Sequence, residues 1–202
     1  MTFAVLPVKD PRNAKQRLAG LLAPPEREAL ARSMYKHVIQ TLRAARGIDR
    51  IAVATSDPAT ARHAQALGAI VFEEQEQLGH SRSADAAARR ARQLGASTVL
   101  LLPVDVPLVT AAEIEEVLTA APRPGMLIVP SRDGTGTNAL VSTPPDAIET
   151  CFGPGSFDLH LRQGEQRGLT VQVLRPPGLV FDVDTPEDFA ELTRHARPDH
   201  PC

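Results

Sequence analysis

The sequence predicts an α/β fold, in which helices flank a mixed, mostly parallel sheet within a single domain. Two observations lead to this prediction. From the N-terminus to Asp105, apolar runs of strand length alternate with segments of helical period, in the order β-α-β-α-β-α-β. After Asp105, an Asp-Gly turn separates two further apolar runs, which indicates that antiparallel strands complete the sheet.

The first strand and helix are predicted from their apolar patterns. Residues 3–8 are almost all apolar and predict a strand, and a polar loop follows at 9–22. Apolar side chains then recur with helical spacing over residues 26–45, and Gly47 marks the end of that helix. A second strand is expected at 50–55, where apolar residues again form a short run.

The next two helices are predicted from their N-terminal residues. Asp57 stands immediately before a proline, which is typical of an N-cap followed by the first helical residue. A third strand at 69–72 leads into an acidic loop at 73–80. Ser81 or Ser83 is the expected cap of the alanine-rich helix that comes next.

The strand at 98–102 is expected at the centre of the sheet, because its residues are apolar or β-branched without polar alternation. Pro103 and Pro107 keep the chain out of the ladder and leave one carboxylate, Asp105, between them. Ligands of open α/β sheets bind beyond the carboxyl ends of the strands, so Asp105 is a candidate functional residue. The alternative is that Asp105 only accepts hydrogen bonds from a proline-rich turn.

The second half of the chain adds shorter elements. Thr110 and Glu113 form a capping-box pattern, which predicts a helix start, and the Asp-Gly pair at 133–134 predicts a turn. The other expected elements are strands at 125–130, 138–142, 169–174 and 179–183 and helices at 157–166 and 185–195. We therefore predict one domain over residues 1–197, followed by a frayed tail at 198–202.

Composition excludes several functional classes. A formal net charge of −2 over 202 residues argues against a nucleic-acid-binding surface. No apolar run approaches the roughly 20 residues that cross a bilayer, and Lys9 and Asp10 interrupt the N-terminal run. We expect a cytoplasmic protein that binds neither nucleic acid nor membrane. Cys151 and Cys202 support no metal-binding pair or disulfide framework, and the sequence leaves a homodimer open.

Lysine is rare in this chain and concentrated after the first strand. The lysines are Lys9, Lys15 and Lys36, and two of them lie in the first polar loop together with Arg17. A lysine is a compact point charge that suits phosphate. These cations could hold a triphosphate, although a solvated surface is the simpler alternative.

A second group of carboxylates lies near the C-terminus. Strand alternation puts Asp182 and Asp184 on one face, where they repel each other unless a cation lies between them. Thr185 and Asp188 are explained as a helix cap, but Asp182 is not. Carboxylate oxygens without histidine or thiolate ligands suit Mg²⁺. We predict a magnesium site at Asp182 and Asp184, with helix capping alone as the alternative.

Two glycine-containing loops are candidate substrate sites. The first offers Thr137 and Asn138, and its alternative is an ordinary turn. The second includes Gly153 and Ser156 before a helix, where free amides can bind an anion or simply be capped. His160 lies one turn into that helix and could face the same pocket, although a lone histidine is more often structural.

The motifs for common nucleotide-binding folds are missing. The sequence contains neither G-x-x-x-x-G-K-[ST] nor G-x-G-x-x-G. No nucleophile-base pair stands out, but one reaction class needs none. A phosphate monoester is itself a nucleophile, and its attack on the α-phosphorus of a nucleoside triphosphate requires positioning and charge neutralisation.

Five motifs follow one another along nearly the whole chain. They are Pro-Val-Lys at 7–9 with Ala-Lys-Gln-Arg-Leu at 14–18, Pro-Val-Asp-Val-Pro-Leu at 103–108, Gly-Thr-Asn-Ala-Leu at 136–140, Phe-Gly-Pro-Gly-Ser-Phe at 152–157 with His160, and Asp-Val-Asp-Thr-Pro-Glu-Asp at 182–188. Together they resemble the 2-phospho-L-lactate guanylyltransferase family. Its members include phosphoenolpyruvate and 3-phosphoglycerate guanylyltransferases of deazaflavin (coenzyme F-420) biosynthesis.

The resemblance implies a nucleotidyltransferase of the glycosyltransferase-A-like, Rossmann-like fold. It implies that GTP and a three-carbon phospho-acid give a guanosine diphospho-product and pyrophosphate. By motif match, Asp105, Asp182 and Asp184 would hold Mg²⁺, while Lys9 and Lys15 would neutralise the triphosphate. The residues that would hold the phospho-acid are Thr137, Gly153 and Ser156.

One departure from the family concerns the loop expected near the base or ribose, where Gly79-His80-Ser81 stands in place of Gly-Leu-Asn. Two alternatives remain open. One is another nucleotidyltransferase of this fold, serving molybdenum-cofactor or sugar-nucleotide synthesis, but the glycine-rich signature after the first strand is absent. The other is a non-catalytic nucleotide-binding module, which predicts a missing acidic residue.

Overall fold

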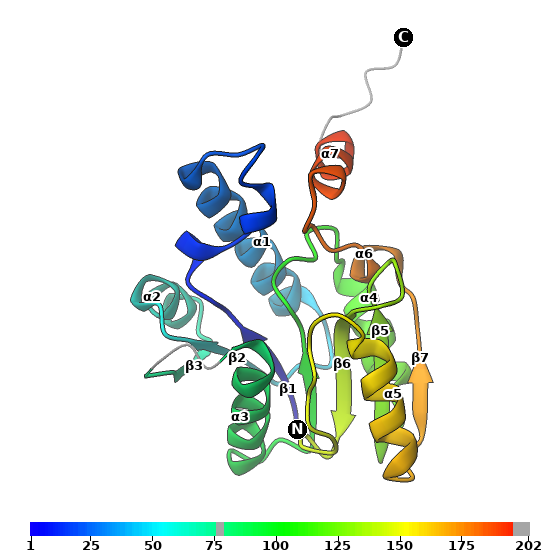
Figure 1. The fold of residues 1–202 in the computed structure, drawn as a ribbon. Helices are drawn as coiled ribbons and strands as arrows, with labels where there is room; N and C mark the ends of the chain where they lie inside the picture. The colour runs from blue at the N-terminus through cyan, green and yellow to red at the C-terminus, as the bar shows by residue number, and fades with distance from the viewer. Residues whose placement is uncertain (76–78, 196–202) are drawn as a thin grey trace.

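A computed structural model describes residues 1–75 and 79–195, and within these ranges seven strands form one mixed sheet. The strand order is β3-β2-β1-β4-β6-β5-β7 (Figure 1). The strands are β1 (Thr2–Pro7), β2 (Arg50–Thr55), β3 (Ile70–Glu73), β4 (Thr98–Leu101), β5 (Gly125–Pro130), β6 (Thr137–Thr143) and β7 (Val171–Val173).

Strand pairing confirms the predicted mixed, mostly parallel sheet. β1 pairs in parallel with β2 and β4, and β2 pairs in parallel with β3. β6 is antiparallel to both β4 and β5, as the Asp-Gly turn predicts, and β7 returns parallel to β5. Leu6 of β1 lies opposite Val53 of β2, so the carboxyl ends of the parallel strands meet at one edge.

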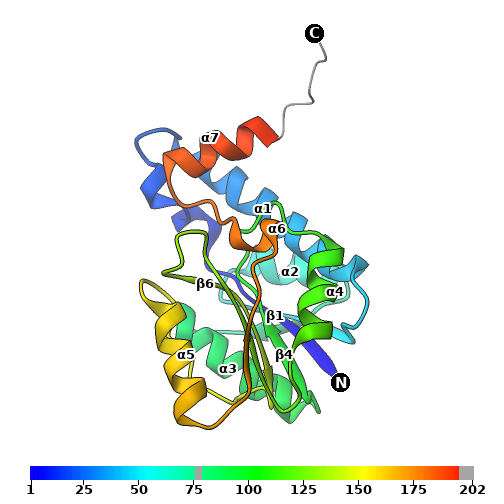
Figure 2. The same cartoon turned by 90° about the vertical axis from the view of Figure 1, so that its right-hand side faces the viewer.

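Helices cover both faces of the sheet in the described ranges (Figures 1 and 2). Residues of α1, α2 and α4 share one apolar core with the sheet, while α3 and α5 share the other. Their bounds are α1 (Pro24–Ala44), α2 (Pro58–Ala66), α3 (His80–Gln93), α4 (Ala111–Ala120), α5 (Ser156–Gln166), α6 (Pro177–Val180) and α7 (Pro186–His195).

The side chains of β1 divide between the two cores, because alternate residues of a strand point to opposite faces. Ala4 and Leu6 contribute to the core under α1 and α4, whereas Phe3 and Val5 contribute to the core under α3. All four are fully buried. An apolar strand buried on both faces fixes the position of the polar loop that follows it.

Two sequence predictions of secondary structure are wrong. Residues 179–183 were expected to form a strand, but α6 ends at Val180 and no strand follows it before α7. Pro176 and Pro177 favour a helical turn here, because proline fits the first helical position. α3 begins at His80 and its N-cap is Gly79, with φ +88°, rather than either expected serine.

The loop at 9–22 is more ordered than the sequence suggests. It contains two short 3-10 helices, η1 (Pro11–Asn13) and η2 (Gln16–Leu18), and Lys15 is the N-cap residue of η2. The predicted tail at 198–202 and part of the acidic loop, residues 76–78, lie outside the described residues. Within the described ranges, no helix is long and apolar enough to cross a membrane.

Candidate active site

A cavity of about 740 Å³ lies beyond the carboxyl ends of the central strands. Loops from distant parts of the sequence line it, and they include most of the residues that the sequence singles out. These are Lys9, Arg17, Asp105, Thr137, Asn138, Gly153, Asp182 and Asp184. The position matches the rule that open α/β sheets bind ligands at this edge.

Lys15 holds the two groups of carboxylates together. Its Nζ donates to Asp105 Oδ2 and to Asp184 Oδ1, both at 2.9 Å, and its side chain is only 8% exposed. Burial alone would lower the pKa of Lys15, but the charges of Asp105 and Asp184 outweigh it and raise that pKa. Arg17 adds a longer ion pair to Asp184, at 3.4 Å.

The backbone at Lys15 is left-handed, with φ +52° and ψ +43°. A residue with a side chain adopts this region rarely and at a cost of about 1–3 kcal/mol. The turn between η1 and η2 therefore places the ammonium ion between the carboxylates at the expense of backbone strain. Such strain is often found in functional loops.

A backbone hydrogen bond joins the two acidic segments directly. Val183 N donates to Asp105 O at 3.0 Å, so the segment before α7 lies beside the loop after β4. Phe181 and Val183 are buried, whereas Asp182 and Asp184 are partly exposed and line the cavity. The expected alternation of faces is present although the segment is not a strand.

Asp182 is held by Asn138. The amide Nδ2 of Asn138 donates to Asp182 Oδ1 at 3.0 Å and to the carbonyl of Leu179 at 3.0 Å. Burial raises the pKa of Asp182, the Asn138 hydrogen bond opposes this, and the negative charges of Asp105 and Asp184 raise it further. A nearby cation would relieve that repulsion.

Asp184 is held in place by the cap of α7, as the capping pattern predicts. Asp188 Oδ2 accepts hydrogen bonds from the backbone N–H of Asp184 at 3.1 Å and of Thr185 at 2.9 Å. It also accepts from the Thr185 hydroxyl at 2.8 Å. The cap therefore orients the chain that carries Asp184.

The three carboxylates have the donor chemistry that a divalent cation requires, since Mg²⁺ prefers oxygen ligands. In the part of the chain that the structure describes, no group of three histidine, cysteine, aspartate or glutamate side chains is arranged as a ready metal site. The ammonium ion of Lys15 lies between Asp105 and Asp184 instead. The residues therefore fit a cation that replaces this ammonium ion.

Ser156 and His160 lie beneath the cavity rather than in its wall, because both are completely buried. His160 Nε2 accepts from the backbone N–H of Cys151 at 2.9 Å, so Nδ1 carries the proton and donates to Thr137 Oγ1 at 3.0 Å. Ser156 Oγ donates to the same hydroxyl at 3.2 Å. Both residues position Thr137, which does line the cavity, and neither reaches the cavity itself.

Burial keeps His160 neutral and lowers its pKa to about 4. The anion site that the sequence predicts at the N-terminus of α5 is only partly available. The Ser156 N–H already donates to Gly153 O at 3.0 Å, whereas Gly153 lines the cavity with φ +129°. Of these two residues, only Gly153 could contact a substrate directly.

The sequence reasoning missed Arg132, which also lines the cavity. Its guanidinium forms ion pairs with Asp188 and Glu191 of α7, both at 2.7 Å, and it lies 5.1 Å from the centre of the Phe181 ring. The sequence feature that could have indicated Arg132 is its position directly before the predicted Asp-Gly turn. The ion pairs join the β5–β6 loop to α7 across one side of the site.

The family described as "Guanylyl transferase CofC like" matches residues 2–201. The chain belongs to this family. It is a guanylyltransferase, and hence a nucleotidyltransferase enzyme. Membership decides against a nucleotidyltransferase of another pathway and against a non-catalytic binding module.

The sequences of individual relatives match this guanylyltransferase over nearly its whole length. A phosphoenolpyruvate guanylyltransferase of Sphaerobacter thermophilus is 43% identical over 195 residues, which are 96% of this chain and 94% of that protein. A 2-phospho-L-lactate guanylyltransferase of Methanothermobacter thermautotrophicus is 34% identical over 202 residues, with coverage of 98% and 87%.

The fold is also that of solved nucleotidyltransferases. A crystal structure of 4-diphosphocytidyl-2C-methyl-D-erythritol synthase superposes with a TM-score of 0.67 at 10% identity. The match covers 97% of this chain and 99% of that chain. At this identity the comparison concerns the fold alone, and it confirms the α/β nucleotidyltransferase architecture that the sequence predicts.

Proposed function

We propose that this guanylyltransferase transfers GMP from GTP to phosphoenolpyruvate and releases pyrophosphate. The observation that carries the proposal is the Lys15 ammonium ion between Asp105 and Asp184 in a cavity at the carboxyl edge of the sheet. The choice of acceptor is supported by the name of the 43% identical relative, whereas the 34% identical relative is named for 2-phospho-L-lactate. The family resemblance assigns this reaction to coenzyme F-420 biosynthesis.

The proposed reaction is a single displacement. A phosphate oxygen of the phospho-acid attacks the α-phosphorus of GTP, and the bond from this phosphorus to the bridging oxygen of the β-phosphate breaks. Pyrophosphate leaves with the electron pair of that bond. Lys9, Lys15 and Arg17 supply positive charge for the triphosphate, which lowers the energy of the charge that develops on its phosphate oxygens.

We propose that Asp105, Asp182 and Asp184 hold Mg²⁺. When bound, Mg²⁺ would supply additional positive charge to the phosphate oxygens. Thr137 and Gly153 are the proposed contacts of the phospho-acid, with Ser156 and His160 fixing the Thr137 hydroxyl from below. A reaction that consumes GTP fits the cytoplasmic location expected from the sequence.

Mass spectrometry of a competition reaction tests the acceptor. The enzyme is incubated with GTP, Mg²⁺ and equal concentrations of phosphoenolpyruvate, 2-phospho-L-lactate and 3-phosphoglycerate. We expect the guanosine diphospho-product of phosphoenolpyruvate to form fastest, together with one pyrophosphate per product. Preferential formation of another product would overturn the choice of acceptor, and the absence of every product would overturn the proposed reaction.

A further inference from the structure

A second hollow lies beside the active-site cavity, between the end of β3 and α3. Its volume is about 290 Å³, near the lower end of the roughly 300–1,000 Å³ typical of ligand pockets. Its lining includes Ala54, Phe72, Glu74, Ser83, Ala87 and Arg90. A pocket of this size fits one flat heterocycle better than a whole nucleotide.

The two hollows are immediate neighbours. His80 lines the active-site cavity and Ser83 lines the second hollow, so the first turn of α3 separates them. Val8, which precedes Lys9, donates its N–H to the carbonyl of Ala54 at 2.8 Å. The second hollow therefore lies beside the end of β1 that leads into the lysine-bearing loop.

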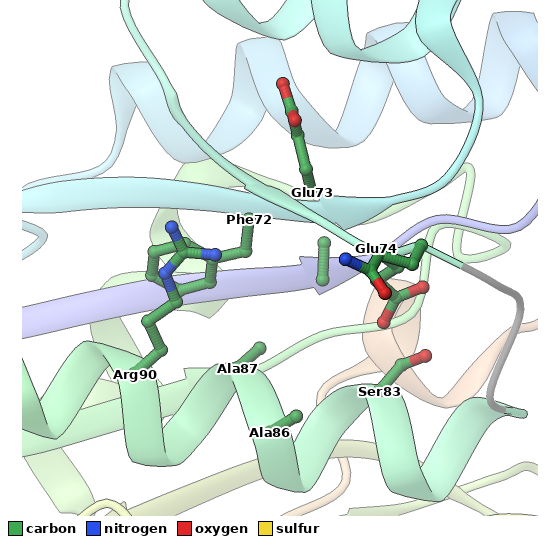
Figure 3. Close-up of a pocket in the computed structure, with 9 residues that line it drawn as sticks. Phe72, Glu73, Glu74, Ser83, Ala86, Ala87 and Arg90 are labelled. Atoms are coloured by element: carbon green, nitrogen blue, oxygen red, sulfur yellow. The ribbon is translucent and has the colours of Figure 1, made fainter.

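The floor of the pocket is apolar and one wall carries a carboxylate. Phe72 and Ala87 are 3% and 2% exposed, and the Arg90 guanidinium lies 4.8 Å from the centre of the Phe72 ring. Glu73 and Glu74 both line the pocket, and Figure 3 shows the Glu74 side chain directed toward Ser83 and the Glu73 side chain directed away from it. Among the residues that the structure describes, the Glu74 carboxylate forms no ion pair.

An unpaired carboxylate suits guanine in particular. The edge of guanine carries adjacent N1–H and N2–H donors, and an ionised carboxylate can only accept, through two oxygens. Two parallel charge-assisted hydrogen bonds can form between them. Adenine presents an acceptor at N1, which a carboxylate repels, and hypoxanthine lacks the N2 amino group.

We propose that Glu74 is the residue that selects guanine, by accepting hydrogen bonds from N1 and N2 of the base of GTP. This inference rests on the proposed function, because it assumes that GTP binds with its phosphates at Lys9. It also accounts for the loop at Gly79-His80-Ser81, which departs from the family pattern. Selection by Glu74 does not depend on the side chains of that loop.

The test compares GTP with inosine triphosphate, which lacks only the N2 amino group. We expect the wild-type enzyme to use GTP with a kcat/KM at least about tenfold higher, since one charge-assisted hydrogen bond is at stake. In Glu74→Gln, kcat/KM for GTP falls about 10–100-fold, and the preference over inosine triphosphate falls to within about threefold. Glu116→Gln is the matched control, because it removes the same charge from an exposed position of α4 that lines neither hollow.

Each outcome separates the two proposals. Equal use of GTP and inosine triphosphate by the wild type, or an unchanged preference in Glu74→Gln, would overturn the role of Glu74 while leaving the guanylyl transfer intact. Loss of the preference in Glu116→Gln as well would also overturn it. A wild type that releases no pyrophosphate from GTP with any of the three phospho-acids contradicts the proposed function instead. Thermal unfolding of both variants checks that each is folded.

Discussion

Lys15 combines a left-handed backbone with a buried ammonium ion, and the partners of that ammonium ion are far away in the sequence. The sequence indicates that Lys15 belongs to a phosphate-binding loop, because lysine is rare in this chain. It does not indicate that the ammonium ion lies between Asp105 and Asp184. That contact requires the strand order, which a local pattern does not contain.

Replacing Lys15 by methionine leaves two carboxylates without their shared cation. In EDTA at pH 7, we expect Lys15→Met to lose about 1–3 kcal/mol of unfolding free energy, less than for a fully buried pair because Asp105 and Asp184 are 27% and 40% exposed. Mn²⁺, used as a probe of the proposed Mg²⁺ site, should restore much of this loss and should bind more tightly to the variant than to the wild type. Thermal unfolding and titration calorimetry measure both effects, with the exposed Lys36→Met as control. Equal melting of Lys15→Met and wild type in EDTA would contradict the expectation.

Asp105 and Asp184 can be tested by isosteric substitution. We expect Asp105→Asn and Asp184→Asn each to lower kcat at least about 100-fold, because charge is removed from the site that positions the triphosphate. Both variants should remain folded, because side-chain volume is unchanged and Lys15 keeps one of its two carboxylate partners. Pyrophosphate release is the measurement, and Asp158→Asn on the exposed face of α5 is the control. Near-normal turnover in either variant would remove its residue from the site.

His160 predicts a dependence of stability on pH. Its pKa is about 4 in the folded protein because the ring is buried, whereas an exposed histidine has a pKa near 6.5. The unfolded chain therefore takes up the proton first as the pH falls. The contribution to stability is complete above pH 6.5 and decreases between pH 6.5 and 4, by at most about 3 kcal/mol.

Urea unfolding of wild type and His160→Gln between pH 7 and 4 measures this contribution. We expect the free energy of unfolding to fall less steeply with decreasing pH in the variant. Protonation of acidic residues lowers the unfolding free energy of both proteins alike. The contribution of His160 is therefore the difference between their slopes of unfolding free energy against pH. Identical slopes would mean that His160 does not resist protonation.

At the scale of elements, the sequence predicts those strands and helices whose signals are local. The apolar runs, the Asp57 and Thr110 caps and the Asp-Gly turn are all found. Residues 179–183 were assigned wrongly because a short apolar run is compatible with strand and helix alike. The outcome there depends on contacts of α6 with Glu113 and Asn138, which are distant in sequence.

α6 is packed too closely to accept a larger residue. The Gly178 N–H donates to Glu113 Oε1 at 2.6 Å, and an added Cβ would collide with the carbonyl oxygen of Leu108. We expect Gly178→Ala to cost about 1–3 kcal/mol and to reduce activity, because α6 leads directly to Asp182. Thermal unfolding and pyrophosphate release measure the two effects.

The control for α6 is Gly20→Ala, because an added Cβ at Gly20 meets no atom within 4 Å. This substitution should leave both the melting temperature and the turnover near their wild-type values. If Gly178→Ala and Gly20→Ala had the same melting temperature, the close contact between α6 and the loop at Leu108 would not be important for stability.

At the scale of the whole molecule, the sequence predicts the class of fold but not the order of the strands. Three pairs of strands that follow one another along the chain are not neighbours in the sheet, namely β3 and β4, β4 and β5, and β6 and β7. Topological rules nevertheless predict that carboxyl ends of parallel strands share one edge. For this reason the sequence alone indicates the edge of the sheet at which the site lies, although it does not indicate the contacts within the site.

A site built from distant segments should link ligand binding to global stability. We expect GTP with Mg²⁺ to raise the melting temperature. A ligand that binds only the folded state, at 100 times its dissociation constant, adds about 2.7 kcal/mol to the free energy of unfolding. Differential scanning fluorimetry over a range of GTP concentrations measures this. No shift at saturating GTP and Mg²⁺ would contradict a nucleotide site in the folded enzyme.

The hydrogen bond from Val183 to the carbonyl of Asp105 has a consequence for biosynthesis. A ribosome adds Lys15 early and Asp105 much later, and it adds Asp184 later still. While the growing chain emerges, the lysine can acquire its first counter-charge only after β4 has been made, and its second only after α6. The nascent protein can therefore assemble most of its sheet while it still lacks a complete catalytic centre, so partly synthesised chains are not expected to consume GTP.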